Sequence, residues 1–259
     1  MRSIKNIVLE CLTSNNIVQG RNGTVRSIYG PSLTHNFYGR LENFPLLTLR
    51  KLHFRTIARE LCWILSGSTN VKDLHPCRVW DKWADEDGNL GPTYGEQMRK
   101  SPDQLKQAEM QIALGNQSRR IMIDLWNAED KHEMRLPPCV FAYQFHVMPN
   151  RRLGLTVYQR SCDVIIGLPH DLASSALFLC MMCHVHGYKP SHLTMHFGDA
   201  HLYQIHEDAA NTLIDRSNLP LSTLDIVGTN YDSILEIPQH ALGILKYNHH
   251  KAIDVEVVA

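Results

Sequence analysis

The spacing of apolar residues along the chain predicts several helices. From His53 to Ser66, apolar side chains recur every three or four residues, which is typical of an amphipathic helix that Gly67 would end. Further helices are expected at residues 1–14, 70–74, 102–115, 172–187 and 201–217. Because the segment 172–187 has few polar residues on any side, we expect that helix to be buried.

Runs of β-branched and aromatic residues between turn residues predict the strands. These are expected at residues 44–49, 121–126, 140–148, 153–158 and 193–197. Residues 149–152 would form a hairpin turn, and Arg21–Gly23 would form a tight turn between two further short strands. Helices and strands do not alternate strictly, so the pattern predicts an α+β fold with a mixed sheet, and we expect one domain over residues 1–259.

The composition narrows the classes of ligand and compartment. Lys and Arg total 26, as do Asp and Glu, which argues against a nucleic-acid polymer and favours a small anion held by a few arginines. The cysteine count of 7 is odd, which argues against a disulfide framework and for a reducing compartment. With no signal-peptide core and no apolar run of roughly 20 residues, we expect a soluble, cytoplasmic protein.

Cys139 is a candidate nucleophile because of its neighbours. It follows Pro137 and Pro138, which fix the backbone and remove two donors, and it heads an apolar strand. A single buried cysteine is most often part of the core. A reactive thiol must ionise, however, and nearby guanidinium groups lower its pKa. Arg160 lies two strand lengths downstream, where a hairpin would bring it alongside Cys139.

Arginines form a candidate site for a phosphate monoester: Arg21, Arg119, Arg120 and Arg160. Planar guanidinium groups suit phosphate because they can donate two parallel hydrogen bonds, and the hydroxyl of Ser161 would add a donor. The adjacent Arg119 and Arg120 are a weak signal alone, since such pairs are usually solvated. On a strand they would point to opposite faces, so one of them must reach elsewhere.

Two further groups of residues have the chemistry of a ligand site. Phe197–Tyr203 is expected to begin a helix, in which His201 and Tyr203 would not share a face. In an extended stretch at the start of that helix, both could approach a sugar hydroxyl. An aromatic cluster beside a Gly-Pro turn is usually core or interface, but it could also stack a pterin ring; it contains Trp80, Trp83 and Tyr94.

The segment Cys180–His184 has the spacing of a c-type haem attachment sequence. It lies inside the expected apolar helix, so core cysteines are the favoured interpretation. A zinc site would need a second ligand pair of matching spacing, and none is clear. The histidines show no HExxH pattern either, so we expect no metal.

These residues lie in motifs that together resemble the thymidylate synthase family, from about Arg21 to the C-terminus. The motifs are Arg21–Thr24, Arg59–Trp63, Val79–Ala84, Leu90–Gly95, Ser118–Arg120, Leu136–Cys139, Gln144–Phe145, Gln159–Asp171 and Gly198–Tyr203. The resemblance implies a large twisted mixed β-sheet packed against helices, with a sheet face at a homodimer interface. It also implies a 2′-deoxynucleoside 5′-monophosphate substrate and 5,10-methylenetetrahydrofolate as carbon donor.

The resemblance also implies roles for the candidate residues. Cys139 would add to C6 of the pyrimidine, and Glu60 would organise proton transfers through water. The phosphate would be held by Arg21, Arg160 and Ser161 of one subunit and by Arg119 and Arg120 of the other. The base and sugar would contact Val140, Gln159, Asp171, His201 and Tyr203. The folate would be covered by Trp80, Trp83, Tyr94, Asp163, Val258 and Ala259.

Two positions in the expected base pocket depart from the family pattern. Asp171 stands where the family ordinarily has Asn, and Val140 stands where it usually has His. Cytosine offers an N3 acceptor and a 4-amino donor, the reverse of uracil. An ionised Asp accepts from the amine, and a protonated one also donates to N3. Phage deoxycytidylate hydroxymethylases, which are similar to thymidylate synthases, also carry Asp here, so the leading interpretation is a dCMP C5 one-carbon transferase.

The product is left open by the sequence. Hydride from the folate would give a methyl group, whereas water would give a hydroxymethyl group. Trp80, Trp83 and a tail that ends at Ala259 favour a dry site and hydride transfer. The cytosine-type pocket favours hydroxymethylation, which is the outcome we expect. The alternatives are a thymidylate synthase acting on dUMP and a non-catalytic nucleotide- or RNA-binding relative, against which the charge balance and the intact Cys139 argue.

Overall fold

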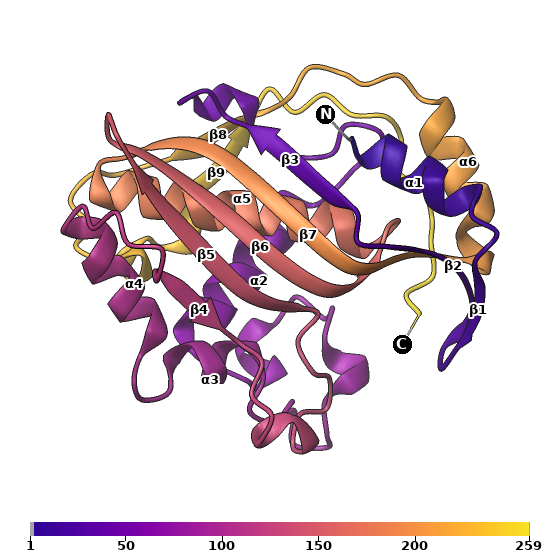
Figure 1. Ribbon diagram of the computed structural model, residues 1–259, viewed down its shortest axis with the longest axis horizontal. Helices are drawn as coiled ribbons and strands as arrows, with labels where there is room; N and C mark the ends of the chain where they lie inside the picture. Colours follow the sequence, from indigo (N-terminus) through magenta and orange to yellow (C-terminus); the bar gives the residue numbers. More distant parts are fainter. Residues whose placement is uncertain (1–2, 259) are drawn as a thin grey trace.

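A computed structural model describes residues 3–258 and shows a twisted sheet with helices on one of its faces (Figure 1). The strands are β1 (Ile17–Gly20), β2 (Gly23–Tyr29), β3 (Ser32–Asn36), β4 (Met122–Asp124), β5 (Val140–Met148), β6 (Arg152–Asp163), β7 (Lys189–Tyr203), β8 (Thr223–Ile226) and β9 (Leu242–Leu245). The helices are α1 (Ile4–Leu12), α2 (Phe54–Ser66), α3 (Tyr94–Arg99), α4 (Gln104–Ala113), α5 (Gly167–His186) and α6 (Glu207–Asp215).

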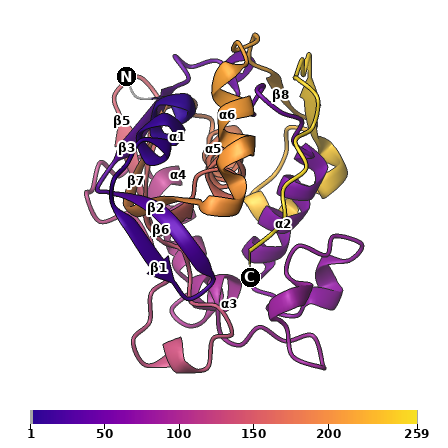
Figure 2. The same ribbon diagram turned by 90° about the vertical axis from the view of Figure 1, so that its right-hand side faces the viewer.

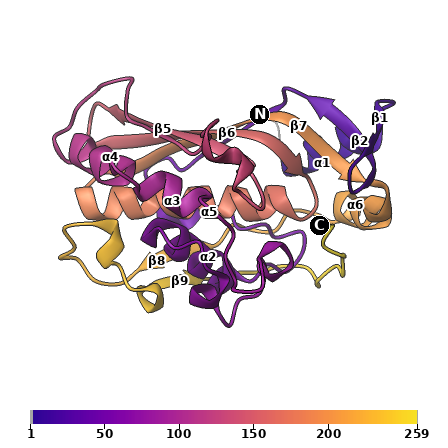
Figure 3. The same ribbon diagram turned by 90° about the horizontal axis from the view of Figure 1, so that it is seen from below.

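Within the described residues, a 7-stranded sheet has the order β1-β2-β7-β6-β5-β4, and β3 also pairs with β7. The pair β6–β7 is parallel, whereas the other pairs of this sheet are antiparallel. The crossover between the parallel strands is α5, which lies under the sheet with α2 beneath it (Figure 3). Phe145 of β5 and Phe178 of α5 meet edge to face in the core between these layers, with ring centroids 5.3 Å apart. The predicted α+β fold with a mixed sheet is confirmed.

The opposite face of the sheet has no described helix over it (Figure 2). Its side chains bond to one another along the surface. The Tyr158 hydroxyl donates to Gln144 Oε1 at 3.1 Å, and His146 shares a hydrogen bond of 2.9 Å with Thr156. The rings of Tyr158 and His196 stack at 5.7 Å. This face is therefore ordered and partly polar, although no helix covers it.

Several local predictions are confirmed. The helix expected at 53–66 is α2, and it ends at Gly67, whose φ of 89° is left-handed. The hairpin at 149–152 turns through Asn150 and Arg151, both at positive φ (61° and 53°), as a tight β-turn with the twist of its strands requires. The remaining expected elements found with shifted ends are α1, a 3-10 helix at Val71–Leu74, α4 and β4.

The strand expected at 44–49 is wrong. Phe44 makes a single bridge to Ser222, and the residues after it pair with no strand. Pro45 has no N–H to donate to a sheet, which disfavours a strand at this point. The apolar run is explained by burial instead, since Leu46 is fully buried and Leu49 is 1% exposed.

The strand expected at 193–197 and the helix expected at 201–217 were bounded wrongly. β7 continues to Tyr203, and α6 begins only at Glu207. Residues 199–203 pair with β2 on one side, and several of them pair with β6 on the other. This non-local pairing supplies the hydrogen bonds that a helix would make locally. His201 and Tyr203 are thus two apart on a strand and share a face, contrary to the expectation for a helix.

β6 and α5 are also longer than expected, and both extensions reach the candidate site. β6 continues past residue 158 to Asp163, and α5 begins at Gly167 rather than at 172. Pro169 is tolerated there because the first turn of a helix has unpaired N–H groups. The cysteines of the haem-like motif are free and buried in this helix. Although α5 is apolar, the described part of the chain contains no helix long and apolar enough to span a membrane.

Candidate active site

Cys139 stands immediately before β5, beside Arg160 of β6. The Arg160 N–H donates to the Cys139 carbonyl at 2.8 Å, and Arg160 Nη2 lies 4.0 Å from Cys139 Sγ. The guanidinium is fixed because it also donates to the carbonyls of Pro137 and Pro138, at 2.8 and 2.9 Å. The expected proximity of Cys139 and Arg160 is confirmed, and the carbonyl groups of the two prolines orient the Arg160 guanidinium.

Burial and the neighbouring charges act on the thiol of Cys139 in opposite directions. Burial raises its pKa, the charge of Arg160 opposes that rise, and Asp171 adds to it. The backbone N–H of Cys139 donates to the Tyr94 hydroxyl at 2.8 Å, which fixes the residue at the head of the strand. The net direction of the Cys139 pKa is upward, so burial outweighs the charge of Arg160.

Asp171 is held at the site by Gln159. Gln159 Nε2 donates to Asp171 Oδ2 at 2.7 Å and to the Ser161 carbonyl at 3.0 Å. Gln159 is 1% exposed, and its Oε1 has no hydrogen-bond partner among the described residues. Burial raises the pKa of Asp171 to about 6, although His170 and the Gln159 hydrogen bond oppose the rise. Near neutral pH, this carboxyl can therefore be populated in both protonation states.

Val140 completes this buried corner. It is 5% exposed, and it lies directly opposite Gln159 in the register of β5 and β6. The structure thus brings together both residues that depart from the family pattern, since Asp171 bonds to Gln159 and Val140 pairs with it. The side chain of Val140 is apolar, so it adds no hydrogen-bonding group beside Asp171 and Gln159.

Glu60 of α2 is buried between two donors. Trp80 Nε1 donates to its Oε1 at 2.5 Å, and His170 Nε2 makes a short contact with its Oε2. Burial opposes ionisation of both groups, yet their mutual attraction lowers the pKa of Glu60 and raises the pKa of His170. Sequence reasoning missed His170. Its position directly before Asp171 was the signal available, and no pattern linked it to Glu60.

The sugar and phosphate candidates gather at the end of β7. The rings of His201 and Tyr203 meet edge to face, with centroids 5.2 Å apart. Burial raises the pKa of Tyr203, Asp163 and Cys139 add to the rise, and Arg21 opposes it, so these groups are within electrostatic reach. Arg21 itself is exposed in the β1–β2 turn, and its side chain bonds to its neighbour Asn22 at 3.0 Å. Ser161 is half-buried and lies beside Asp199 in the β6–β7 register.

Arg119 and Arg120 do not reach this site within one chain. They are exposed in a turn before β4, so the strand considered for them is wrong. The Arg119 carbonyl accepts from Gln144 Nε2 at 3.0 Å, and Gln144 is about 16 Å along the strand from Cys139 at the usual rise per residue. Within residues 3–258, neither arginine makes a hydrogen bond or ion pair with Cys139 or Arg160.

The candidate folate residues surround Trp80. Its ring lies 5.6 Å from those of both Trp83 and Tyr94, and the two tryptophans are only half-buried, so a flat ring could stack against them. Asp163 Oδ1 accepts the N–H groups of Ile165 and Ile166 at 2.8 and 3.1 Å, so it also fixes the turn that leads into α5.

The C-terminal segment is held near the same loop. Lys82, between the two tryptophans, donates to the Val257 carbonyl at 3.3 Å, and His206 Nε2 contacts the Glu256 carbonyl at 2.9 Å. Val258 is half-buried at the end of this segment. Ala259 lies outside the described residues. The C-terminal segment therefore bonds to the segment Trp80–Trp83, which is expected to cover the folate.

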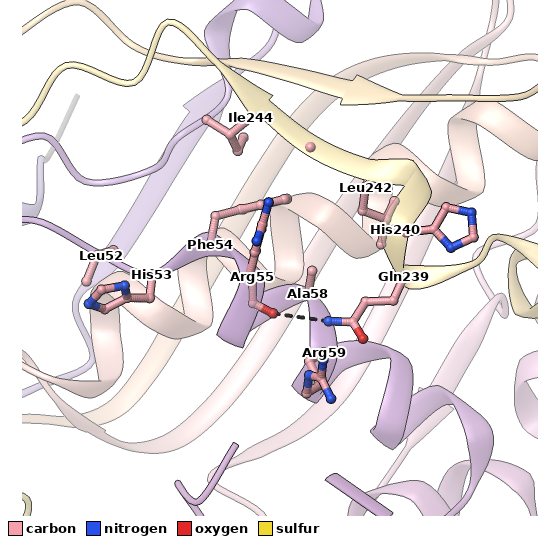
Figure 4. Close-up of a pocket in the computed structure, with 11 residues that line it drawn as sticks. Leu52, His53, Phe54, Arg55, Ala58, Arg59, Gln239, His240, Leu242 and Ile244 are labelled. Carbon is pink, nitrogen blue, oxygen red and sulfur yellow. Dashed lines mark hydrogen bonds between the residues drawn. The ribbon is translucent and has the colours of Figure 1, made fainter. Parts of the chain in front are cut away.

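A cavity of about 680 Å³ lies elsewhere, between the start of α2 and the strand β9 (Figure 4). Arg55, Arg59 and His240 are among its lining residues, and Gln239 Nε2 donates to the Arg55 carbonyl at 3.4 Å. None of the candidate site residues lines it. It is separate from the cluster around Cys139.

The amino-acid sequence matches a known family along nearly the whole chain. The sequence model described as thymidylate synthase matches residues 2–259. The match includes both sides of the cluster, from the β1–β2 turn to the C-terminal segment.

Proposed function

Since the chain belongs to the thymidylate synthase family, we propose that it transfers a one-carbon unit to C5 of dCMP. Family membership establishes the coarser activity, which is folate-dependent C5 methyl transfer to a pyrimidine nucleotide. It also establishes 5,10-methylenetetrahydrofolate as the co-substrate. We propose the identity of the nucleotide and of the product, and the role of each residue. We also propose that residues 1–259 form one catalytic domain.

The Asp171–Gln159 pair is the observation that carries the choice of cytosine. Asp171 Oδ1 makes no hydrogen bond within residues 3–258, and Gln159 Oε1 is buried without a partner. A 4-amino group would satisfy such acceptors, and a protonated Asp171 would donate to N3. Uracil would set its O4 against them, and each unmatched buried polar group costs about 1–3 kcal/mol.

The chemistry at the ring follows from Cys139. Addition of its thiolate at C6 breaks the aromaticity of the pyrimidine and makes C5 an enamine-like nucleophile. C5 then takes up the one-carbon unit, and Glu60 organises the proton transfers. Arg160, at 4.0 Å from the sulfur, favours the thiolate over the thiol. His201 and Tyr203 bind the 3′-hydroxyl, and the half-buried Trp80, Trp83, Tyr94, Asp163 and tail residues provide a surface for the folate.

The phosphate site requires a second subunit in this proposal. Arg21, Arg160 and Ser161 provide donors from one chain, and Arg119 and Arg120 of the partner subunit provide the rest. The uncovered face of the sheet supports a homodimer, because its ordered, partly apolar side chains would be buried between two copies. Further arginines near the nucleotide would add to the effect of Arg160 in favouring the Cys139 thiolate.

For the product we propose 5-hydroxymethyl-dCMP, with 5-methyl-dCMP as the second candidate. The second has its own support, since Lys82 and His206 hold the tail near the tryptophans and a closed site would exclude water. Conversion of dUMP to dTMP is the alternative at the level of the base. A non-catalytic relative is disfavoured by the Cys139–Arg160 geometry.

Mass spectrometry of the products from dCMP and from dUMP, each with methylenetetrahydrofolate, tests the proposal. We expect a dCMP product 30 mass units heavier than dCMP, as one added CH₂O group requires, and no stoichiometric dihydrofolate, since water rather than hydride completes the reaction. A strong preference for dUMP would overturn the choice of base, and dihydrofolate release would overturn the hydroxymethyl product. Cys139→Ala should abolish turnover, and Cys62→Ala, also at a half-buried cysteine, is its control.

A further inference from the structure

We propose that His170 is a positioning residue that holds Glu60 ionised and in one orientation for the proton transfers of the reaction. The inference rests on the proposed C5 transfer and adds a residue to it. The Glu60 carboxylate contacts residues of two elements. Trp80, in the loop before Trp83, donates to Oε1, and His170 of α5 contacts Oε2. The residue that follows His170 is Asp171, so one turn of α5 carries both the base-reading carboxyl and this histidine.

The need for His170 follows from the burial of Glu60. Glu60 is 8% exposed, and a buried carboxylate without partners becomes neutral rather than remaining charged. Trp80 supplies a neutral donor to one oxygen. His170 supplies the opposite charge as well as a donor to the other oxygen, and it reverses the effect of burial on the Glu60 pKa. Without His170, the carboxyl would be protonated over more of the pH range, and the Trp80 hydrogen bond alone would orient it.

The charged and titratable groups around the pair are consistent with this state. The groups that interact electrostatically with Glu60, with His170 or with their immediate neighbours are Arg50, Arg59, Cys77, Tyr143, Asp163 and Asp171. Asp171 favours a charged His170, whereas Arg50 opposes it. Arg50 is fixed at the start of α5, where it donates to the Ile165 carbonyl at 2.9 Å. The ionised pair has no net charge, so it leaves Asp171 able to exchange its proton near neutral pH.

The step that depends on Glu60 is loss of the C5 proton. The C5–H bond breaks, its electron pair forms the exocyclic double bond, and the folate nitrogen leaves with the pair of its C–N bond. The proton passes through water to Glu60, which must be ionised to accept it. His170 Nδ1 makes no hydrogen bond within the described residues, so the imidazole acts through its contact with Glu60 rather than through a second protein partner.

The test compares His170→Ala, which removes the charge and the donor, with His170→Gln, which keeps an amide donor without a charge. For the alanine variant we expect kcat to fall on the order of ten- to a hundredfold, with the nucleotide KM within about twofold of wild type. The acidic limb of the kcat profile should move to higher pH in both variants, because burial then dominates the Glu60 carboxyl. The glutamine variant should recover part of kcat but not the position of the limb. His184→Gln is the control, since His184 lies on the same helix and bonds to the Gly228 carbonyl at 2.7 Å.

The outcomes separate this inference from simpler ones. An acidic limb that stays in place in both variants overturns it, as does a change confined to KM. Equal loss in His184→Gln would also overturn it, because the effect would then be one of helix stability. The assay uses whichever of dCMP and dUMP the wild type alkylates. A wild type that prefers dUMP therefore refutes the proposed base while leaving the test of His170 intact.

Discussion

The proposed base side and the proposed phosphate side of the site differ in how completely one chain forms them. On the base side, Gln159 is buried and holds Asp171 at 2.7 Å, and Val140 packs opposite. On the phosphate side, Arg160 is fixed by its carbonyl partners, but Arg21 is exposed and bonds to its neighbour. The pair Arg119–Arg120 lies in an exposed turn away from Cys139.

This difference indicates that selection of the base and affinity for the phosphate depend on different parts of the site. A polar group that is buried and already oriented on folding loses little entropy on binding, so it discriminates strongly between bases. An exposed arginine must be ordered by the ligand or by a second subunit, so its contribution depends on assembly. We therefore infer that one chain fixes which base is accepted, and that the dimer determines how tightly the phosphate is held.

The largest expected effect is on base selection. Asp171→Asn replaces the carboxyl with an amide that can answer the uracil edge, so the ratio of kcat/KM for dCMP to that for dUMP should fall. A mismatch of about 1–3 kcal/mol corresponds to a change of roughly five- to 150-fold. Steady-state kinetics with both nucleotides measures it, with Asp215→Asn, at an exposed carboxyl at the end of α6, as the control. An unchanged ratio would mean that Asp171 does not read the base.

The sequence predicted which residues meet at this site only where local signals connect them. Cys139 and Arg160 could be placed together because the hairpin between them carries strong local turn signals at Asn150 and Arg151. Asp171 could be singled out because it lies in a motif. The parts that depend on residues far apart in the chain could not be predicted. His170 and Glu60 are 110 residues apart, and nothing local records their contact.

The errors in the fold have the same origin. The helix expected from residue 201 is a strand as far as Tyr203, because β2 and β6 pair with it from both sides. The strand expected at 44–49 has apolar residues but no partner strand, since Pro45 interrupts the donors that a sheet needs. In both cases long-range pairing, present in the first and missing in the second, decided the secondary structure.

A smaller effect is expected at the phosphate side, and its form tests the contribution of the partner subunit. Arg120→Ala should raise the nucleotide KM by about tenfold, since a charged hydrogen bond contributes about 1.5–3 kcal/mol when fully formed. At a nucleotide concentration well below KM, Arg120→Ala should keep about a tenth of wild-type activity, as its tenfold higher KM requires. Mixing it with the inactive Cys139→Ala, after dissociation and reassembly, should raise the activity to about a quarter of wild type, because half of randomly formed dimers are hybrids and each hybrid contains one complete site. A mixture that stays at or below the level of Arg120→Ala would place Arg120 in its own subunit's site or outside the site.

The smallest expected effect is on stability, and it distinguishes the buried side from the exposed one. The pKa of Asp171 is raised to about 6 on folding from the usual 3.8, so the folded state binds the extra proton between these values. Stability from this group is therefore present at acidic pH and lost as pH rises through 6. Asp171→Asn should remove that pH dependence. The difference in Tm between the variant and the wild type should therefore be several degrees more positive at pH 7 than at pH 5, at about 2–4 °C per kcal/mol for a chain of this size. Arg21→Gln should leave the slope unchanged, because it alters an exposed side chain in the β1–β2 turn. Calorimetry at both pH values measures the difference, and a parallel shift of Tm in Asp171→Asn would show that the carboxyl is solvated rather than buried.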